Sequence, residues 1–297
     1  MAQPDPKLLA RITRLTGQRP VQVRTVQRGY TPATRLVITL ADNSTCFAKV
    51  ATTDYIAPWL RQEYYIYQNL AGTFMPRCLG WDDDGREPIL LLEDLSGAFW
   101  PPPWNEELIE AVLEALAAIS TTTIAGLPSI TADQSLLAGW QRVAEDPQPF
   151  LALGLVSSSW LEAALPTLLG LDIAAAIEGE TLLHLDVRSD NICLVGRRAM
   201  LIDWNHACLG HPHVDVGGWL ASLAAEGGPP PQSILPDAAE IAAMMSGYFA
   251  SKAGLPIIPE APHVRQIQYV QLKTALPWVI RALDLPPADG PGWSVEE

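Results

Sequence analysis

The chain has 297 residues, 48% of them hydrophobic and 18% charged, which is enough for one large domain or two smaller ones. Its formal net charge is −14 and its Lys and Arg residues form no run, so the composition argues against a nucleic-acid partner. No apolar run approaches the roughly 18 residues needed to span a bilayer, and the first residues lack the apolar core of a signal peptide. Four scattered cysteines predict reduced thiols in a cytoplasmic protein with no membrane partner.

The first third of the chain predicts strands with helices beside them. Residues 7–16 have helical apolar spacing that stops at Gly17. Three segments rich in Val, Ile and Thr follow, at 21–27, 34–42 and 44–52, and they predict strands. A second helical pattern covers 58–71. The stretch "PRCLGWDDDGREPILLLEDL" then predicts two strands joined by an acidic turn at Asp82 to Gly85.

After residue 96 the composition changes. The stretch "AFWPPPW" predicts a rigid connector, because proline fixes φ and removes a hydrogen-bond donor. Helical patterns follow at 105–120, 237–253 and 263–284, and Asp237 with Glu240 predicts a capping box for the second of them. We therefore expect a nucleotide-binding lobe over residues 1–96 and a larger catalytic and substrate-binding lobe over residues 97–297.

The stretch "LLHLDVRSDNICLVGRRAMLIDWNHA", residues 182–207, interrupts the helical part with polar groups set among apolar triplets. Its two apolar segments predict short strands joined by a turn at Gly196 to Arg198. A buried carboxylate costs several kcal/mol unless a partner offsets it, so the polar groups call for a functional explanation. A polar hairpin at the boundary of two lobes predicts a ligand cleft.

Phosphoryl transfer explains this set of residues. It needs a positioned base, a metal clamp and cations over the phosphates. Asp186 supplies a carboxylate that can deprotonate a hydroxyl, while Asn191 and Asp203 supply the oxygen ligands that Mg²⁺ prefers. Lys49, on the third predicted strand, supplies a cation for nucleotide phosphates, and Glu63 on the following helix can pair with it.

These motifs resemble a known family. "HLDVRSDN" resembles the H-x-D-x-x-x-x-N loop of protein-kinase-like enzymes, and "LIDW" stands where they carry D-F-G. "IDW" followed by "GHPHVDVGGW" is closer to the small-molecule branch, the aminoglycoside phosphotransferase and choline kinase relatives. The resemblance implies an α+β, two-lobed protein-kinase-like fold. In it, an antiparallel sheet of about five strands and the Glu63 helix form the first lobe, and the second lobe is mainly helical.

The resemblance also implies roles for single residues. Asp186 would be the catalytic base, Asn191 and Asp203 the Mg²⁺ ligands, and Lys49 the contact to the α- and β-phosphates, paired with Glu63. The backbone from Glu93 to Leu95 would meet adenine, Asp215 would brace the catalytic loop, and His184 would hold that loop. Arg188, two residues after the base, either touches the γ-phosphate or faces solvent. The loop "VQRGYTPATR" departs from the family pattern because it lacks the G-x-G-x-x-G signature.

The expected activity is ATP- and Mg²⁺-dependent phosphorylation of a hydroxyl on a small molecule: an aminoglycoside-like antibiotic, a sugar or an amino alcohol. Acids of the second lobe, such as Glu226, Asp237, Glu260 and Asp284, are candidates to meet cationic groups of the acceptor. Two alternatives remain open at this point. One is a catalytically inactive nucleotide-binding protein, and the other is a zinc site on the loop that carries His206, Cys208, His211 and His213.

Overall fold

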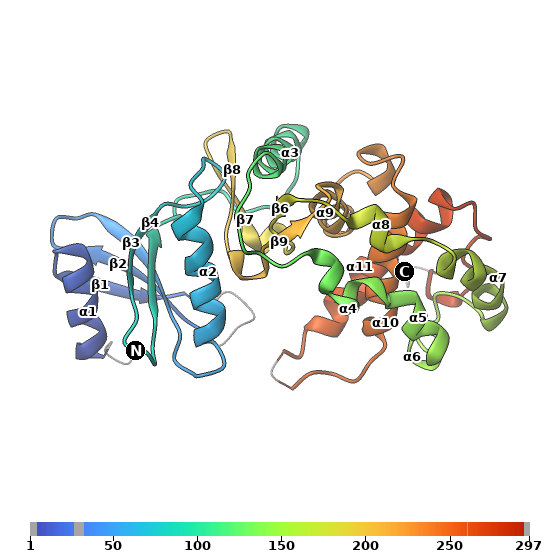
Figure 1. The fold of residues 1–297 in the computed structure, drawn as a ribbon, viewed down its shortest axis with the longest axis horizontal. Coiled ribbons are helices and arrows are strands. Elements are labelled where there is room, and N and C mark those ends of the chain that lie inside the picture. The colour runs from blue at the N-terminus through green and yellow to red at the C-terminus, as the bar shows by residue number, and fades with distance from the viewer. Residues whose placement is uncertain (1–4, 27–32, 260, 294–297) are drawn as a thin grey trace. The chain divides into compact units, whose positions relative to one another are not determined.

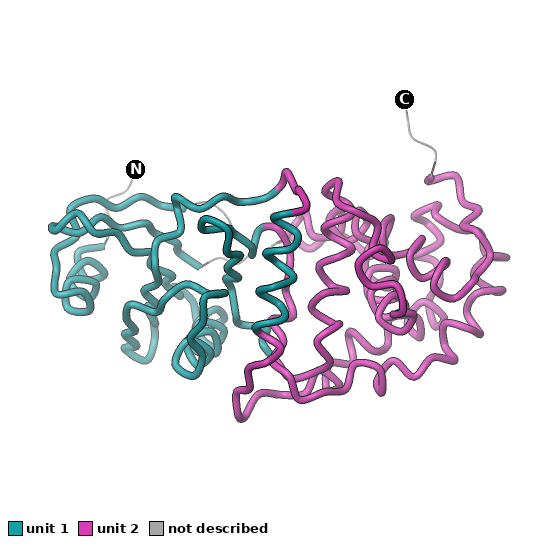
Figure 2. The backbone as a smooth tube through the Cα atoms, turned by 90° about the horizontal axis from the view of Figure 1, so that it is seen from above, with its two compact units in different colours: residues 1–101, 107–118, 190–207 teal, residues 102–106, 119–189, 208–297 magenta. Residues whose placement is uncertain are grey.

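The computed structural model describes residues 5–26, 33–259 and 261–293. The chain divides into two compact units, which Figure 2 shows in teal and magenta. The first comprises residues 1–101, 107–118 and 190–207, and the second comprises residues 102–106, 119–189 and 208–297. The division differs from one drawn after residue 96, because a helix and a hairpin from later in the chain pack with the first unit. Among the described helices, none is both long and apolar enough to cross a membrane.

Within the described residues, the first unit holds a five-stranded antiparallel sheet in the order β1-β2-β3-β5-β4. Its strands are β1 (Pro20–Thr25), β2 (Thr34–Leu40), β3 (Thr45–Val50), β4 (Cys78–Asp82) and β5 (Ile89–Glu93). The strands expected from alternation and β-branched residues are confirmed. The expected nucleotide-covering loop falls largely on residues 27–32, which lie outside the described residues.

Two helices lie on opposite faces of this sheet (Figure 1). Helix α1 (Pro6–Thr16) inserts Ile12 into a core that includes Ala48 and Val50 of β3. Because successive side chains of a strand point to opposite faces, Lys49 points to the other face, where helix α2 (Ala57–Asn69) lies. Strand β3 thus carries core residues on one face and a functional lysine on the other.

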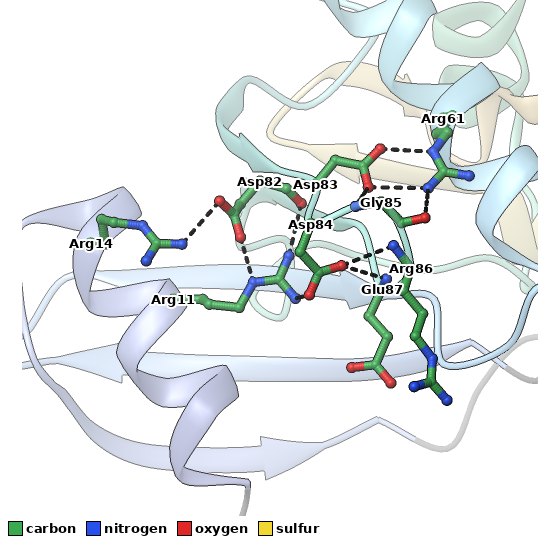
Figure 3. Close-up of polar contacts among 9 residues, drawn as sticks. All are labelled: Arg11, Arg14, Arg61, Asp82, Asp83, Asp84, Gly85, Arg86 and Glu87. Carbon is green, nitrogen blue, oxygen red and sulfur yellow. Dashed lines mark hydrogen bonds and ion pairs between the residues drawn. The ribbon is translucent and has the colours of Figure 1, made fainter.

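Arginines from both helices hold the acidic turn between β4 and β5 (Figure 3). Arg11 of α1 is ion-paired with Asp82, Arg14 lies 3.1 Å from the same carboxylate, and Arg61 of α2 lies 2.7 Å from Asp83. Single exposed pairs contribute at most about 1 kcal/mol, but together they connect α1 and α2 to the same sheet edge. The carboxylates at the acidic turn therefore already form ion pairs with arginines of the first unit.

The stretch singled out in the sequence forms the expected hairpin in the first unit. Strand β7 (Ile192–Val195) pairs with β8 (Arg198–Leu201), and Ile192 lies opposite Leu201. Gly196 makes the turn with φ of 63°, a conformation that glycine adopts without strain. Backbone hydrogen bonds of 2.8 and 2.9 Å join Leu194 to Phe99 and extend the hairpin.

The second unit is mainly helical, and its strands β6 (Thr181–Leu183) and β9 (Cys208–Gly210) pair antiparallel. Helix α3 (Glu106–Ser120) follows the sheet in the chain, and most of it belongs to the first unit. The helices of the second unit are α4 (Gln134–Leu137), α5 (Gly139–Glu145), α6 (Gln148–Leu151), α7 (Ser158–Leu169), α8 (Ile173–Ile177), α9 (His213–Ala225), α10 (Ala239–Ala253) and α11 (Val264–Ala282). Single 3₁₀ turns lie at Ile130–Ala132, Ser189–Asn191, Trp204–His206, Pro231–Ser233 and Pro291–Trp293. An α+β class with a helical second part is confirmed.

Helix α10 is the core of the second unit, and neighbours including α5 and α11 pack on it (Figure 1). At the crossing with α5, a Cβ placed on Gly139 would stand 2.3 Å from the backbone of Gly247, so the two helices touch backbone to backbone. Trp140 closes the crossing by donating from Nε1 to the Ala243 carbonyl at 3.0 Å. The predicted capping box at the start of this helix is wrong, since Ala238 is the N-cap and no side chain caps it.

Candidate active site

Lys49 lies at the centre of a buried charge cluster in the first unit. Its Nζ is 2.5 Å from Glu63 Oε2 and 2.5 Å from Asp203 Oδ1. Lys49 is 8% exposed and Glu63 only 1%, so both groups have left water. Lys49 comes from β3, Glu63 from α2, and Asp203 from the segment just after β8. The structure therefore brings together three of the residues singled out from the sequence.

The two carboxylates keep the lysine charged. Burial alone lowers the pKa of the Lys49 ammonium, but Glu63 and Asp203 outweigh it and the net direction is upward. Burial also raises the pKa of Glu63, and Lys49 opposes that shift. The cluster thus holds a fixed ammonium with its stem packed in the sheet, which suits contact with an anionic phosphate.

Asn191 and Asp203 stand at the open end of the β7–β8 hairpin. Asn191 directly precedes the Ile192–Leu201 pair, Asp203 follows it by two residues, and the Ile202 N–H donates to the Asn191 carbonyl at 3.0 Å. Asp203 has a left-handed φ of 68°, and Asn191 is 5% exposed. One carboxylate and one amide in neighbouring positions are hard oxygen donors, so the donor set fits Mg²⁺.

The loop that carries Asp186 belongs to the second unit. Arg188 Nε lies 3.2 Å from Asp186 Oδ1, and the Asp186 N–H donates to His184 Nδ1 at 3.3 Å. His184 is fully buried, whereas the Asp186 side chain keeps about a third of its surface accessible (31%). The loop is therefore held by a buried histidine while its carboxylate stays reachable.

Asp215, at the start of α9, braces the same loop. Its two carboxylate oxygens accept the backbone N–H groups of His184 at 2.7 Å and Leu185 at 2.8 Å. Burial raises the pKa of Asp215 to about 6, although these two hydrogen bonds oppose the shift. Leu185 has a left-handed φ of 63°, so the carboxylate stabilises a backbone conformation that a leucine rarely adopts.

Glu226 makes contacts that the sequence did not predict. The sequence suggested that it would meet a cationic group of the acceptor. Its carboxylate accepts from Trp104 Nε1 at 2.7 Å and from Ser189 Oγ at 2.5 Å. Ser189 stands three residues after Asp186, so Glu226 holds the Asp186 loop at its second end. The donors are distant in the chain, and no local pattern points to this contact.

The segment proposed to meet adenine ends strand β5. The Glu93 side chain accepts from Arg77 Nε at 3.2 Å, and the Glu93 N–H donates to the Arg77 carbonyl. The Leu95 carbonyl accepts from the Ala98 N–H at 3.0 Å in a turn. These contacts fix the backbone path over Glu93 to Leu95.

The residues of the alternative zinc site do not form a metal-binding cluster. Among the described residues, no group of three or more His, Cys, Asp or Glu side chains is arranged to hold a metal ion. Cys208 is buried in β9, and the rings of His211 and His213 contact each other edge to face. Of the acids expected on the acceptor side, Asp237 and Asp284 are exposed and Glu260 lies outside the described residues.

Comparisons with known proteins agree with this arrangement. The sequence model described as the phosphotransferase enzyme family matches residues 22–249. A choline/ethanolamine kinase family protein from Mesorhizobium loti is similar in structure, with a TM-score of 0.59, 14% identity, and coverage of 94% of this chain and 96% of that one. A macrolide 2'-phosphotransferase from Brachybacterium faecium gives a TM-score of 0.54 at 15% identity, with 95% and 98% covered.

A spectinomycin phosphotransferase, solved in complex with ADP and spectinomycin, gives a TM-score of 0.57 at 12% identity, with 91% and 94% covered. Likeness at these identities establishes the two-lobed, kinase-like fold. A comparison with curated proteins finds no significant match.

Proposed function

Because the chain belongs to the phosphotransferase enzyme family, we propose that it transfers a phosphoryl group from Mg²⁺–ATP to a hydroxyl group of a small molecule. The observation that carries this proposal is Lys49, held at 2.5 Å by both Glu63 and Asp203 in a buried position. A buried ammonium fixed by carboxylates from a helix and a hairpin is the device that kinase-like sites use for nucleotide phosphates. The spectinomycin phosphotransferase of similar fold was solved with ADP, which supports ATP as the donor.

In the proposed reaction, Lys49 binds the α- and β-phosphates, and Glu63 orients its ammonium. Asn191 and Asp203 would hold Mg²⁺, which would supply positive charge to the phosphate oxygens when bound. The backbone from Glu93 to Leu95 contacts adenine. These assignments rest on residue chemistry and on the contacts within the first unit.

Asp186 is the proposed base. Its carboxylate takes the proton of the acceptor hydroxyl, the hydroxyl oxygen forms a bond to the γ-phosphorus, and the bond from that phosphorus to the ADP oxygen breaks. Asp215 and His184 position the loop, and Arg188, 3.2 Å from Asp186, is placed to orient its carboxylate or to meet the γ-phosphate. We further propose a cytoplasmic location, which free thiols at all four cysteines support.

The test is ADP release from Mg²⁺–ATP across a library of neutral, cationic and anionic alcohols. We expect at least one acceptor to be phosphorylated. We expect Asp186→Ala and Asp203→Ala each to lower kcat by about 10³-fold or more, because such groups act as a unit in the transition state. Glu162→Ala, an exposed acid on α7, is the matched control and should leave kcat unchanged.

Two outcomes would contradict the proposal. Near-normal turnover in Asp186→Ala would remove the assigned base. Nucleotide binding without ADP release for any acceptor would favour an inactive nucleotide-binding protein.

A further inference from the structure

Around Tyr248 of α10, the second unit gathers cations from three helices, α5, α10 and α11. Lys252 Nζ, one turn further along the helix, lies 3.9 Å from the centre of the Tyr248 ring. Gly247, next to Tyr248, is the point where α5 crosses α10 at backbone contact, and a Cβ on Gly139 would stand 2.6 Å from the Tyr248 backbone nitrogen, so the start of α5 lies against this part of α10. Arg142 follows three residues after Gly139 on α5, and its Nη2 lies 3.4 Å from the Gln134 carbonyl.

Arg265, near the start of α11, joins the same end of α10. Its Nε donates to the carbonyl of Pro256, four residues after Lys252, at 3.2 Å, and its Nη1 donates to Gln268 at 2.9 Å. Both contacts are to neutral groups. Burial is the main cause that lowers the pKa of the half-buried Lys252. The charges of Arg142 and Arg265 lower this pKa further, and the charge of Asp133 raises it.

Tyr248 links this cation group to the loop of the proposed base through the charge of Asp186. After burial, the carboxylate of Asp186 is the largest influence that raises the pKa of Tyr248, and Arg188 and Arg265 act in the opposite direction. Asp186 lies 3.2 Å from Arg188, and the carboxylate that raises the pKa of Lys252 is that of Asp133. The Asp133 side chain already caps α4 by accepting the Ser135 N–H at 2.8 Å. Within the described residues, none of the three cations forms an ion pair with a carboxylate.

We propose that the group formed by Tyr248, Lys252, Arg265 and Arg142 binds an anionic substituent, a carboxylate or a phosphate, of the acceptor alcohol. Lys252 and Arg265 are partly buried and Arg142 is exposed. Cations that form no ion pair with a carboxylate gain most from an anion, because charge-assisted hydrogen bonds to carboxylate or phosphate are the strong ones. Glu226, an acid expected to meet a cationic acceptor, is bound to Trp104 and Ser189. The inference deepens the proposed function and rests on it for the reaction, and it departs from an aminoglycoside-like acceptor.

The experiment uses four matched three-carbon probes on the full chain: glycerate, glycerol 3-phosphate, neutral glycerol and cationic 3-amino-1,2-propanediol. Competitive acetylation, read by mass spectrometry, measures how fast Lys252 is acetylated in the presence of each probe, at constant ionic strength. We expect glycerate or glycerol 3-phosphate to slow acetylation of Lys252 at least threefold, and the difference between them tells carboxylate from phosphate. The internal control is Lys273 of α11, a half-buried lysine 5.9 Å from the Tyr269 ring, whose rate should not change.

Variants extend the test to turnover. With the best anionic acceptor found by ADP release, Lys252→Gln and Arg265→Gln should each raise KM at least tenfold with little change in kcat, whereas Lys273→Gln should match the parent. Any of three results would overturn the inference. Glycerol protects Lys252 from acetylation as well as the anions do, the anions protect Lys273 as well as Lys252, or neither anion protects Lys252. Mg²⁺–ATP binding, measured in parallel by calorimetry, separates the two proposals. Its absence counts against the proposed function alone, and phosphorylation of only neutral or cationic alcohols counts against the anion site alone.

Discussion

At the scale of single residues, we expect the cluster of Lys49, Glu63 and Asp203 to contribute to stability as well as to the proposed function. Removing one partner of a buried ion pair costs about 3–5 kcal/mol, because the remaining charge stays buried without compensation. We expect Lys49→Met to lower the free energy of unfolding by about that amount, since it leaves two carboxylates facing each other. Urea unfolding followed by circular dichroism measures the change.

The double variant Lys49→Met/Glu63→Met provides the control for this cycle. It removes the buried carboxylate together with the ammonium, so its loss of stability should be smaller than the sum of the two single losses. Additive losses would show that the 2.5 Å contact between Lys49 and Glu63 contributes no coupling.

We expect Asp215 to make the stability of the fold around the Asp186 loop depend on pH. Its folded pKa of about 6 lies above the ordinary value near 3.9, so the folded protein holds this proton more tightly than the unfolded chain. The associated stability is fully present below pH ~4 and is lost as pH rises through about 6, a change of about 2–3 kcal/mol. Asp215→Asn should lack this decline. Urea unfolding of both proteins from pH 4.5 to 7.5 measures it, and parallel curves would contradict the assignment.

The sequence predicted the local part of the site and missed its long-range part. Lys49 and Glu63 are fourteen residues apart on a strand and the next helix, so strand alternation and helical spacing place them together. Glu226 was read as an acid for the acceptor because its donors, Trp104 and Ser189, reach it only through the tertiary fold. The cations near Tyr248 were missed for the same reason, since they come from three separate helices, α5, α10 and α11.

At the scale of elements, the crossing of α5 and α10 sets the geometry around Tyr248. A Cβ on Gly247 would stand 2.7 Å from Trp140 Cδ1, and the Trp140 ring is buried and hydrogen-bonded to Ala243. We expect Gly247→Ala to destabilise the protein by about 1–3 kcal/mol through overpacking. Gly218→Ala, inside α9 with its nearest contact at 3.9 Å, should be neutral or stabilising by up to about 1 kcal/mol. Thermal unfolding compares the pair, and equal behaviour would show that the crossing is not tight.

Elements with strong periodicity were predicted and short ones were not. The sheet strands, α2 and the β7–β8 hairpin follow from alternation, helical spacing and Gly196. Helices α4 to α8 were not identified, because several of them span only four to seven residues and carry too few apolar repeats. The three-residue strands β6 and β9 pair with each other, although the Asp186 loop and the β7–β8 hairpin separate them in the chain. No local sequence pattern predicts such a pairing.

At the scale of the whole molecule, the division into two units separates the proposed roles. The groups proposed for nucleotide and Mg²⁺, which are Lys49, Glu63, Asn191 and Asp203, belong to the first unit. The proposed base and the group formed by Tyr248, Lys252, Arg265 and Arg142 belong to the second. Nucleotide and acceptor are therefore expected to stabilise different parts of the chain.

Hydrogen–deuterium exchange tests this separation. A ligand at about 100 times its Kd stabilises the state that binds it by about 2.7 kcal/mol, which slows exchange through global or local opening of that part by about 100-fold. With Mg²⁺–ATP, we expect the strongest protection in peptides covering β3, α2 and the β7–β8 hairpin, because their residues supply the phosphate and metal contacts. Lys49→Met should abolish this protection, whereas Lys252→Gln should leave it intact, since Lys252 belongs to the second unit. Protection confined to α10 and α11 would instead place the nucleotide on the second unit and would contradict the roles assigned to Lys49, Asn191 and Asp203.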